Sequence, residues 1–152
     1  MIEFKERGIL IFSKISSENN LYLKILTQKD EIITGLSFGG STKKKKNIFQ
    51  IGYFLNIVIK NKNKNFPNSI SAELSKPYYH NIFNDKYKLH ALLTLVSLLN
   101  ISIIEGQKVS GLFNLSENII EILANEKKWI INYFIFILNL LKIIGYDIDY
   151  QK

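Results

Sequence analysis

Apolar and polar residues alternate along the first half of the chain with the period of two that is typical of β-strands. Residues 20–27 show this most clearly, because their aliphatic side chains share one face while Tyr22 and Lys24 share the other. Similar patterns predict four further strands, at residues 8–15, 31–38, 49–60 and 69–76. Five strands with hairpin-like links favour a closed barrel, since closure removes the exposed edges of a sheet.

After Pro77 the apolar residues recur with helical spacing. A first helix is expected over residues 85–104, with Asn84 as its N-cap and Asp85 in its first turn, where negative charge suits the helix dipole. A second helix is expected over residues 108–124, and its regular part is expected to begin at Asn114 or Ser116.

Residues 127–144 predict a third helix, which Gly145 is suited to end. Apolar residues nearly surround this segment, so we expect it to be the buried, central helix of the bundle. Its most apolar run, residues 129–144, contains two asparagines and a lysine. Because that run is also shorter than the roughly 20 residues that cross a bilayer, no membrane association is expected.

Together these patterns predict an α+β protein with two domains. Residues 1–78 are expected to form a five-stranded OB-fold barrel, and residues 79–152 a small α-helical domain. An SH3-like barrel is the main alternative for the first domain.

The net charge of +7 is spread unevenly over these two parts. Residues 1–78 contain 13 lysines and arginines against 6 aspartates and glutamates, whereas residues 79–152 contain 7 of each. A compositional drift toward Lys, Asn and Ile would raise lysine in both parts. The asymmetry therefore favours a partner rich in phosphate, bound by the β-rich part.

Four consecutive lysines, Lys43–Lys46, follow Gly39 and Gly40 and predict a basic loop that contacts a phosphate backbone. A solvated loop without a ligand is the alternative interpretation. Further basic residues lie on the strands and in a later loop that a small barrel brings near the first. The candidate backbone-binding residues are Arg7, Lys24, Lys43, Lys44, Lys45, Lys46, Lys60, Lys62 and Lys64.

Tyr22 is the aromatic residue best placed to stack on a base, because it shares the outer strand face with Lys24. Such stacking contributes about 1–3 kcal/mol per base. Most of the other aromatic residues of the β-rich part are expected to fill the barrel.

Several kinds of chemistry have no residues to support them. The chain has no cysteine, which excludes disulfides, thiol catalysis and Cys-ligated zinc and is compatible with a cytoplasmic setting. The two histidines, His80 and His90, have no carboxylates at metal-binding spacing. We therefore expect no catalytic residue, no metal and no cofactor. The N-terminus has charges of both signs and no apolar core, so a signal peptide is not expected.

Several short motifs occur in an order that points to one family. They are the opening strand Glu6–Leu10, the strand Leu21–Thr27, Gly39-Gly40 before a basic loop, Gln50-Ile51-Gly52, the Ala72–Leu74 strand, the Tyr87–Leu99 helix and the closing segment Leu141–Asp149. In this order they resemble the RecO family of DNA repair proteins. The family has a Gln-Pro-Gly-like turn where Ile51 stands here, and its closing segment reads Leu-Gly-Tyr-x-Leu-Asp.

The resemblance implies an OB-fold followed by a helical domain, and a non-enzymatic recombination mediator. Such a protein binds single- and double-stranded DNA, anneals complementary strands and helps to load recombinase onto DNA coated with single-strand-binding protein, with RecR as its partner. Family members usually continue beyond the closing segment, so this chain is expected to be a short form or a fragment. The alternative function is a protein-interaction module with an SH3-like barrel and an apolar helical docking face.

The basic loop departs from the family pattern, because it contains lysine where arginine is common. Contact with phosphates is expected to survive this difference, whereas bidentate contacts are not.

Overall fold

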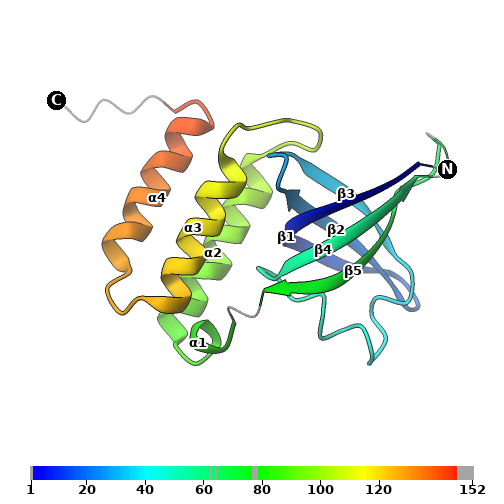
Figure 1. Ribbon diagram of the computed structural model, residues 1–152, viewed down its shortest axis with the longest axis horizontal. Helices are drawn as coiled ribbons and strands as arrows, with labels where there is room; N and C mark the ends of the chain where they lie inside the picture. The colour runs from blue at the N-terminus through cyan, green and yellow to red at the C-terminus, as the bar shows by residue number, and fades with distance from the viewer. Residues whose placement is uncertain (1, 62, 64, 77–78, 147–152) are drawn as a thin grey trace.

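The computed structural model describes residues 2–61, 63, 65–76 and 79–146. Within these residues the strands are β1 (Ile2–Ser17), β2 (Asn20–Thr27), β3 (Ile32–Ser37), β4 (Phe54–Asn61) and β5 (Ser69–Lys76). The helices that follow are α1 (Tyr79–Phe83), α2 (Lys86–Ser102), α3 (Leu112–Asn125) and α4 (Ile130–Ile143). The strands form one end of the molecule and the helices the other (Figure 1).

The five strands close into a barrel in the order β1-β2-β3-β5-β4. The long strand β1 pairs with β4 along its first half, from Ile2 to Ile9, and with β2 along its second half, from Gly8 to Ser17. Two register shifts in the β1–β2 ladder let β1 bend from one partner to the other. The predicted α+β class, with an OB-like five-stranded barrel before a helical region, is confirmed.

The predicted strands at residues 20–27 and 69–76 have the bounds that the structure shows, but the predicted start of the fourth strand at Phe49 is wrong. Phe49 is buried in the barrel core, and the chain then turns so that the Tyr53 amide donates to the Gln50 carbonyl. Gly52 has a positive φ of 84°, and a Cβ there would lie 2.9 Å from the side chain of Leu92. Because of this turn, β4 begins at Phe54 and not at Phe49.

Two helix starts also differ from their predictions. Asp85, not Asn84, is the N-cap of α2, because its side chain accepts hydrogen bonds from the Tyr87 and Lys88 amides. Helix α3 begins at Leu112, and Ser116 lies buried inside it with its hydroxyl donating to the Leu112 carbonyl.

The cap of α3 comes from the barrel. The carboxylate of Asp30, in the turn between β2 and β3, accepts hydrogen bonds from the amides of Gly111 and Phe113 at 2.9 Å each. A cap supplied from 81 positions earlier in the chain has no local sequence signal.

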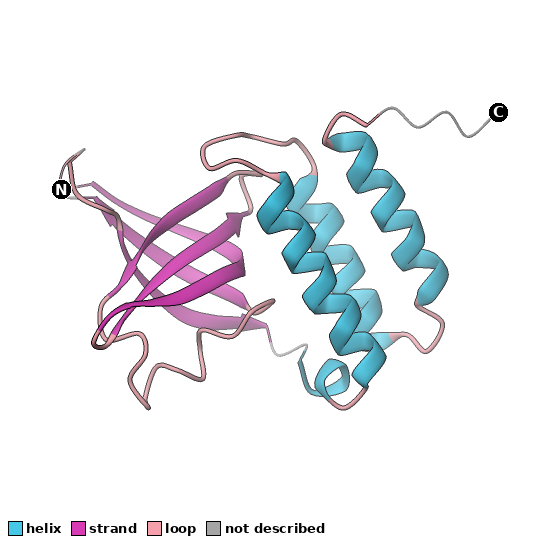
Figure 2. Cartoon of the chain, turned by 180° about the vertical axis from the view of Figure 1, so that it is seen from behind, coloured by secondary structure: helices cyan, strands magenta, loops and turns pink. Residues whose placement is uncertain are grey.

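The prediction of α4 as the central helix is wrong, because α4 is the outermost helix of the bundle (Figure 2). Only Phe136 and Leu140 are buried along its length, and they pack with α2 and α3 in the core. Gly145 does end the helix as predicted: its φ is 101°, and the Tyr146 amide donates to the Leu141 carbonyl.

The barrel end and the helices share one apolar core, in which Ile9 and Phe54 of the strands pack with Leu92 and Phe113 of the helices. A second core fills the interior of the barrel around Leu23, Ile25 and Ile57. The division into two domains at residue 78 stays a prediction. In the described part of the chain, no helix is long and apolar enough to cross a membrane.

Candidate nucleic-acid interface

The outer surface of β1 and β2 carries two aromatic rings interleaved with two lysines. The register pairs Phe12 with Lys24 and Lys14 with Tyr22, so all four side chains lie on one side of the sheet. The rings of Phe12 and Tyr22 meet edge to face with centroids 6.4 Å apart. Lys24 Nζ lies 5.7 Å from the Phe12 ring and Lys14 Nζ lies 6.0 Å from the Tyr22 ring. We call these four residues the aromatic–lysine face.

This face confirms the strand alternation predicted for residues 20–27. Leu21, Leu23 and Ile25 are buried in the barrel, whereas Tyr22 and Lys24 are partly exposed. The sequence analysis missed Phe12 and Lys14 as candidates. The signal that finds them is the antiparallel pairing of β1 with β2, which places them opposite Lys24 and Tyr22.

The lysine tract, Lys43–Lys46, lies in the connection between β3 and β4, and all four side chains are exposed. Its backbone forms a helical turn, since the amides of Lys45 and Lys46 both donate to the Thr42 carbonyl. Two hydrogen bonds tie the start of this loop to the β1–β2 turn: the Ser41 amide donates to the Asn19 carbonyl, and the Gly39 amide to Asn20 Oδ1. The tract is thereby attached to the hairpin that bears the aromatic–lysine face.

Lys60 stands at the end of β4, where its ammonium pairs with Glu3 at 3.4 Å. It belongs to the β1–β4 side of the barrel and not to the aromatic–lysine face. Lys62 and Lys64, predicted to join it, lie outside the described residues. The convergence of the two basic loops therefore stays a prediction.

Arg7 faces the helices and not the outer barrel surface. Its guanidinium forms an ion pair with Glu117 of α3 at 2.5 Å, and the guanidinium carbon lies 5.3 Å from the Phe113 ring centroid. Lys76 at the end of β5 pairs with the same Glu117 and with Glu121. These contacts give Arg7 a structural role between barrel and helices, and its predicted contact with DNA stays a prediction.

Two further carboxylates accept hydrogen bonds, and one of them, Glu105, stands near the candidate interface. Glu105 accepts a hydrogen bond from the hydroxyl of Thr34, which is the β3 neighbour of Lys24. Glu6 accepts a hydrogen bond from Lys29, which raises the pKa of the Lys29 ammonium above its ordinary value. The Glu105 charge borders the aromatic–lysine face and opposes binding of a polyanion there.

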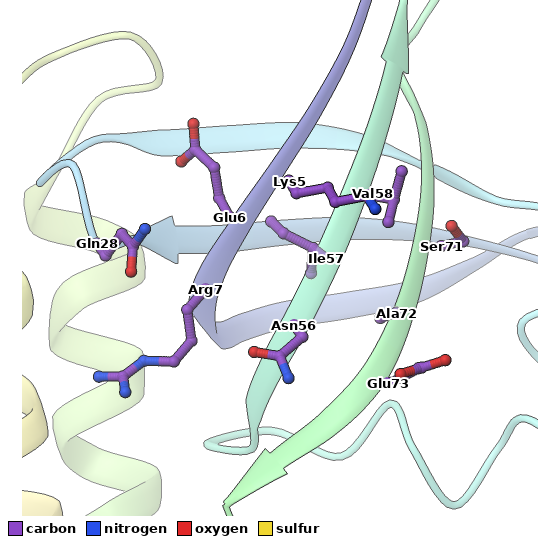
Figure 3. Close-up of a pocket in the computed structure, with 10 residues that line it drawn as sticks. All are labelled: Lys5, Glu6, Arg7, Gln28, Asn56, Ile57, Val58, Ser71, Ala72 and Glu73. Carbon is purple, nitrogen blue, oxygen red and sulfur yellow. The ribbon is translucent and has the colours of Figure 1, made fainter.

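A hollow of about 670 Å³ lies on a different side of the barrel, over β1, β4 and β5 (Figure 3). Charges of both signs line it, with Lys5 and Arg7 against Glu6 and Glu73. Figure 3 shows the Arg7 side chain directed away from Lys5, toward the helices. This mixed lining does not suit a phosphate backbone as well as the aromatic–lysine face does.

Groups of three or more histidine, aspartate and glutamate side chains that could hold a metal ion do not occur among the residues that the structure describes. His80 instead contacts the side-chain amide of Asn84 at 3.1 Å. The described surface thus presents aromatic rings and cations without a metal centre beside them.

Comparison with known proteins agrees with the resemblance that the order of motifs indicates. A family model described as the C-terminal part of recombination protein O matches residues 84–152. Over 151 residues, the chain is 26% identical to the DNA repair protein RecO of Rickettsia canadensis (strain McKiel) and of Rickettsia bellii (strain OSU 85-389). The chain is thus similar to proteins of the RecO family over nearly its whole length.

The similarity to RecO of these two organisms covers 99% of this chain and 62% of each relative. A more distant relative, the DNA repair protein RecO of Dinoroseobacter shibae, is 22% identical over 149 residues, which are 98% of this chain and 62% of that protein. The chain therefore spans less than two thirds of the length of the curated relatives it matches.

Proposed function

We propose that this chain is a RecO-family protein that binds DNA in repair and recombination, and that single strands lie across the aromatic–lysine face with their phosphates against the lysine tract. The observation that carries the proposal is the pairing of Tyr22 and Phe12 with two lysines on one exposed sheet surface. Stacked bases and flanking cations are the two elements of single-strand binding that tolerate any sequence.

The hydrogen bonds from Ser41 and Gly39 to the β1–β2 turn support the second part of the proposal. They hold the start of the lysine loop against the turn between the two strands that bear the stacking rings. A DNA strand that extends from the two rings is therefore expected to reach the lysine tract. Binding is expected to be largely independent of sequence, because contacts to phosphates carry no direct base readout.

The role we propose is non-catalytic and follows the family. It includes annealing of complementary strands and help in loading recombinase on DNA coated with single-strand-binding protein, with RecR and single-strand-binding protein as partners. Double-stranded DNA is expected to bind through the lysine tract alone, because paired bases are not available to Tyr22 and Phe12. The names of the relatives, DNA repair protein RecO, support this assignment.

The test is an anisotropy titration with a labelled single strand of mixed sequence and with the corresponding duplex. Replacing Lys43–Lys46 by alanine is expected to weaken binding of both, by about tenfold or more at low salt. A matched variant removes the same number of charges from the helical region, at Lys86, Lys127, Lys128 and Lys142, which are all exposed. Equal losses in the two variants would contradict the proposed site, since only net charge would then matter.

The alternative function, a protein-interaction module, predicts that neither variant changes DNA binding because the wild-type chain binds no DNA. Mediator activity is tested separately, by annealing of complementary oligonucleotides and by retention on immobilised RecR or single-strand-binding protein. These outcomes distinguish DNA binding at this face from the wider family role.

A further inference from the structure

Phe38 is an exposed aromatic residue that directly follows β3. Its side chain is 57% exposed, whereas Phe49 and Phe54 of the same barrel are buried. Single exposed apolar residues are normal on protein surfaces, so the exposure alone assigns no role. The neighbours of Phe38, which come from β2 and from the lysine tract, decide what its ring can contact.

The pairing of β3 with β2 fixes the side of the sheet on which Phe38 lies. Tyr22 pairs with Leu36, so these two side chains share the outer side of the barrel. The chain stays beside β2 after Leu36, since the Gly39 amide donates to Asn20 Oδ1 at 3.1 Å. Side chains alternate along an extended chain, so Phe38, two residues after Leu36, lies on the same side as Tyr22. Phe38 thus extends the aromatic–lysine face beyond Tyr22.

A cation of the lysine tract lies directly beside Phe38. The exposed Lys45 side chain donates a hydrogen bond from Nζ to the Phe38 carbonyl oxygen at 3.2 Å. The Thr42 hydroxyl donates to the Gly39 carbonyl at 2.7 Å, which holds the turn between Phe38 and the tract. An ammonium in this place can neutralise the phosphate next to a base that lies on the ring. Phe38 therefore stands between the rings of the aromatic–lysine face and the cations of the tract.

We propose that Phe38 is a third base-stacking position, which continues the path of a single DNA strand from Phe12 and Tyr22 to the lysine tract. The inference rests on the proposed function, because it extends the same binding site. The ring centroids of Phe12 and Tyr22 are 6.4 Å apart. Diagonal neighbours across a strand pair, such as Tyr22 and Phe38, are about 7–8 Å apart.

These spacings determine the form of the ligand. Both are about twice the 3.4 Å that separates successive nucleotides along one strand of a duplex. The three rings therefore fit an extended single strand whose bases have separated from one another, and they do not fit stacked base pairs. Every base has a flat face that can lie on a phenyl ring, so the position accepts any base. Phe38 is thus expected to add affinity for single strands and none for duplexes.

The first test compares Phe38→Ala with a matched variant, Phe4→Ala, by anisotropy titration of a single strand and of the corresponding duplex. Phe4 is 47% exposed and has Lys29 Nζ 5.9 Å from its ring, but it lies on the part of β1 that pairs with β4. Phe38→Ala is expected to weaken single-strand binding by about 5- to 150-fold, the range for one stacked base, and to leave duplex binding unchanged. Phe4→Ala is expected to bind both ligands like the wild type.

The outcomes separate this inference from the proposed function. If the wild-type chain binds no single strand, both fail. If the wild type binds single strands and Phe38→Ala binds them equally well, Phe38 is not a stacking position and the proposed function stands. An equal loss of single-strand and duplex binding in Phe38→Ala would mean that the substitution displaces the lysine tract, and it would also overturn the inference.

The second test detects stacking without relying on affinity. The chain has one tryptophan, Trp129, which lies at the start of α4 and gives a constant background. The intrinsic fluorescence of Phe38→Trp is expected to fall more than that of the wild type on titration with oligothymidylate, because a base stacked on an indole quenches it. Phe4→Trp is expected to change no more than the wild type. Equal quenching in Phe38→Trp and Phe4→Trp overturns the proposal.

Discussion

The aromatic–lysine face and the outward side of α4 both expose large apolar side chains, but they differ in what lies between them. On the barrel, Tyr22 and Phe12 alternate with lysines whose ammonium groups lie about 6 Å from the ring centroids. Four exposed apolar residues of α4, which we call the α4 stripe, follow one another without a charge between them: Ile131, Phe134, Ile135 and Leu138. The first arrangement suits a ligand with flat bases and phosphates, and the second does not.

The difference teaches that exposed aromatic residues alone do not indicate nucleic acid. Phe134 is 64% exposed, yet its exposed neighbours Ile131, Ile135 and Leu138 are apolar and uncharged. Tyr22 is less exposed but stands opposite Lys14 in the β1–β2 ladder and near the hairpin that anchors the lysine tract. The two surfaces therefore differ in charge: the register of β1 and β2 places lysines beside the rings on the barrel, and there are no such lysines between the residues of the α4 stripe.

The largest effect is expected at the ion pairs that join the barrel to the helices. Replacing Glu117 by alanine leaves the partly buried Arg7 and Lys76 without their shared carboxylate, and is expected to lower the free energy of unfolding by about 2–3 kcal/mol. Urea unfolding followed by circular dichroism measures this change. The exposed Glu73 on β5 is the control, and its replacement by alanine is expected to cost less than about 0.5 kcal/mol. Equal effects of the two substitutions would show that the ion pairs contribute nothing specific.

The next effect separates the two surfaces directly. Tyr22→Ala is expected to weaken single-strand binding by about 5- to 150-fold, which is the range for loss of one stacked base. Phe134→Ala on the α4 stripe is expected to leave DNA affinity unchanged. Anisotropy titration measures both, and Tyr22→Phe is expected to bind like the wild type because the ring is kept. A loss in Phe134→Ala as large as that in Tyr22→Ala would break the comparison.

A smaller effect is expected at the cap that the barrel supplies to α3. Asp30→Ala removes the acceptor for the Gly111 and Phe113 amides and is expected to lower the free energy of unfolding by about 1 kcal/mol. Asp30→Asn keeps an acceptor and tolerates the positive φ of 65° at this position, so it is expected to stay close to the wild type. Thermal unfolding of the three proteins ranks them. A cost in Asp30→Asn equal to that in Asp30→Ala would mean that capping is not the cause.

The smallest effect concerns the carboxylate beside the aromatic–lysine face. Glu105→Gln keeps a partner for Thr34 but removes a negative charge close to Lys24, and is expected to strengthen DNA binding by about 1.5- to 5-fold at low salt. The gain is expected to disappear at high salt because the charges are exposed and screened. Titrations at two salt concentrations check both points, and an unchanged affinity at low salt would place the DNA path away from Glu105.

Strand alternation was sufficient to predict the barrel and the outward position of Tyr22 and Lys24. It was not sufficient for Arg7, because only the packing of α3 against β1 reveals Glu117 as its partner. The N-terminal cap of α3 was missed for the same reason, since Asp30 lies far away in sequence. Contacts between distant segments leave no periodic signal, so they become visible only in the structure.

Helix α4 shows the opposite error. Apolar residues on nearly all sides predicted a buried central helix. The structure places α4 at the edge of the bundle, with Ile131 and Phe134 exposed. The periodicity of apolar residues indicates which faces of a helix are apolar. It does not show whether such a face is buried against the rest of the same chain.

The salt dependence of single-strand binding tests the central claim most directly. The logarithm of the binding constant is plotted against the logarithm of salt concentration for the wild type and for the variant with alanine at Lys43–Lys46. The proposal predicts a slope that becomes shallower by about 0.7 for each lysine that contacts a phosphate, up to about 3 for the whole tract. An unchanged slope in this variant would contradict the proposal that the lysine tract binds the DNA backbone.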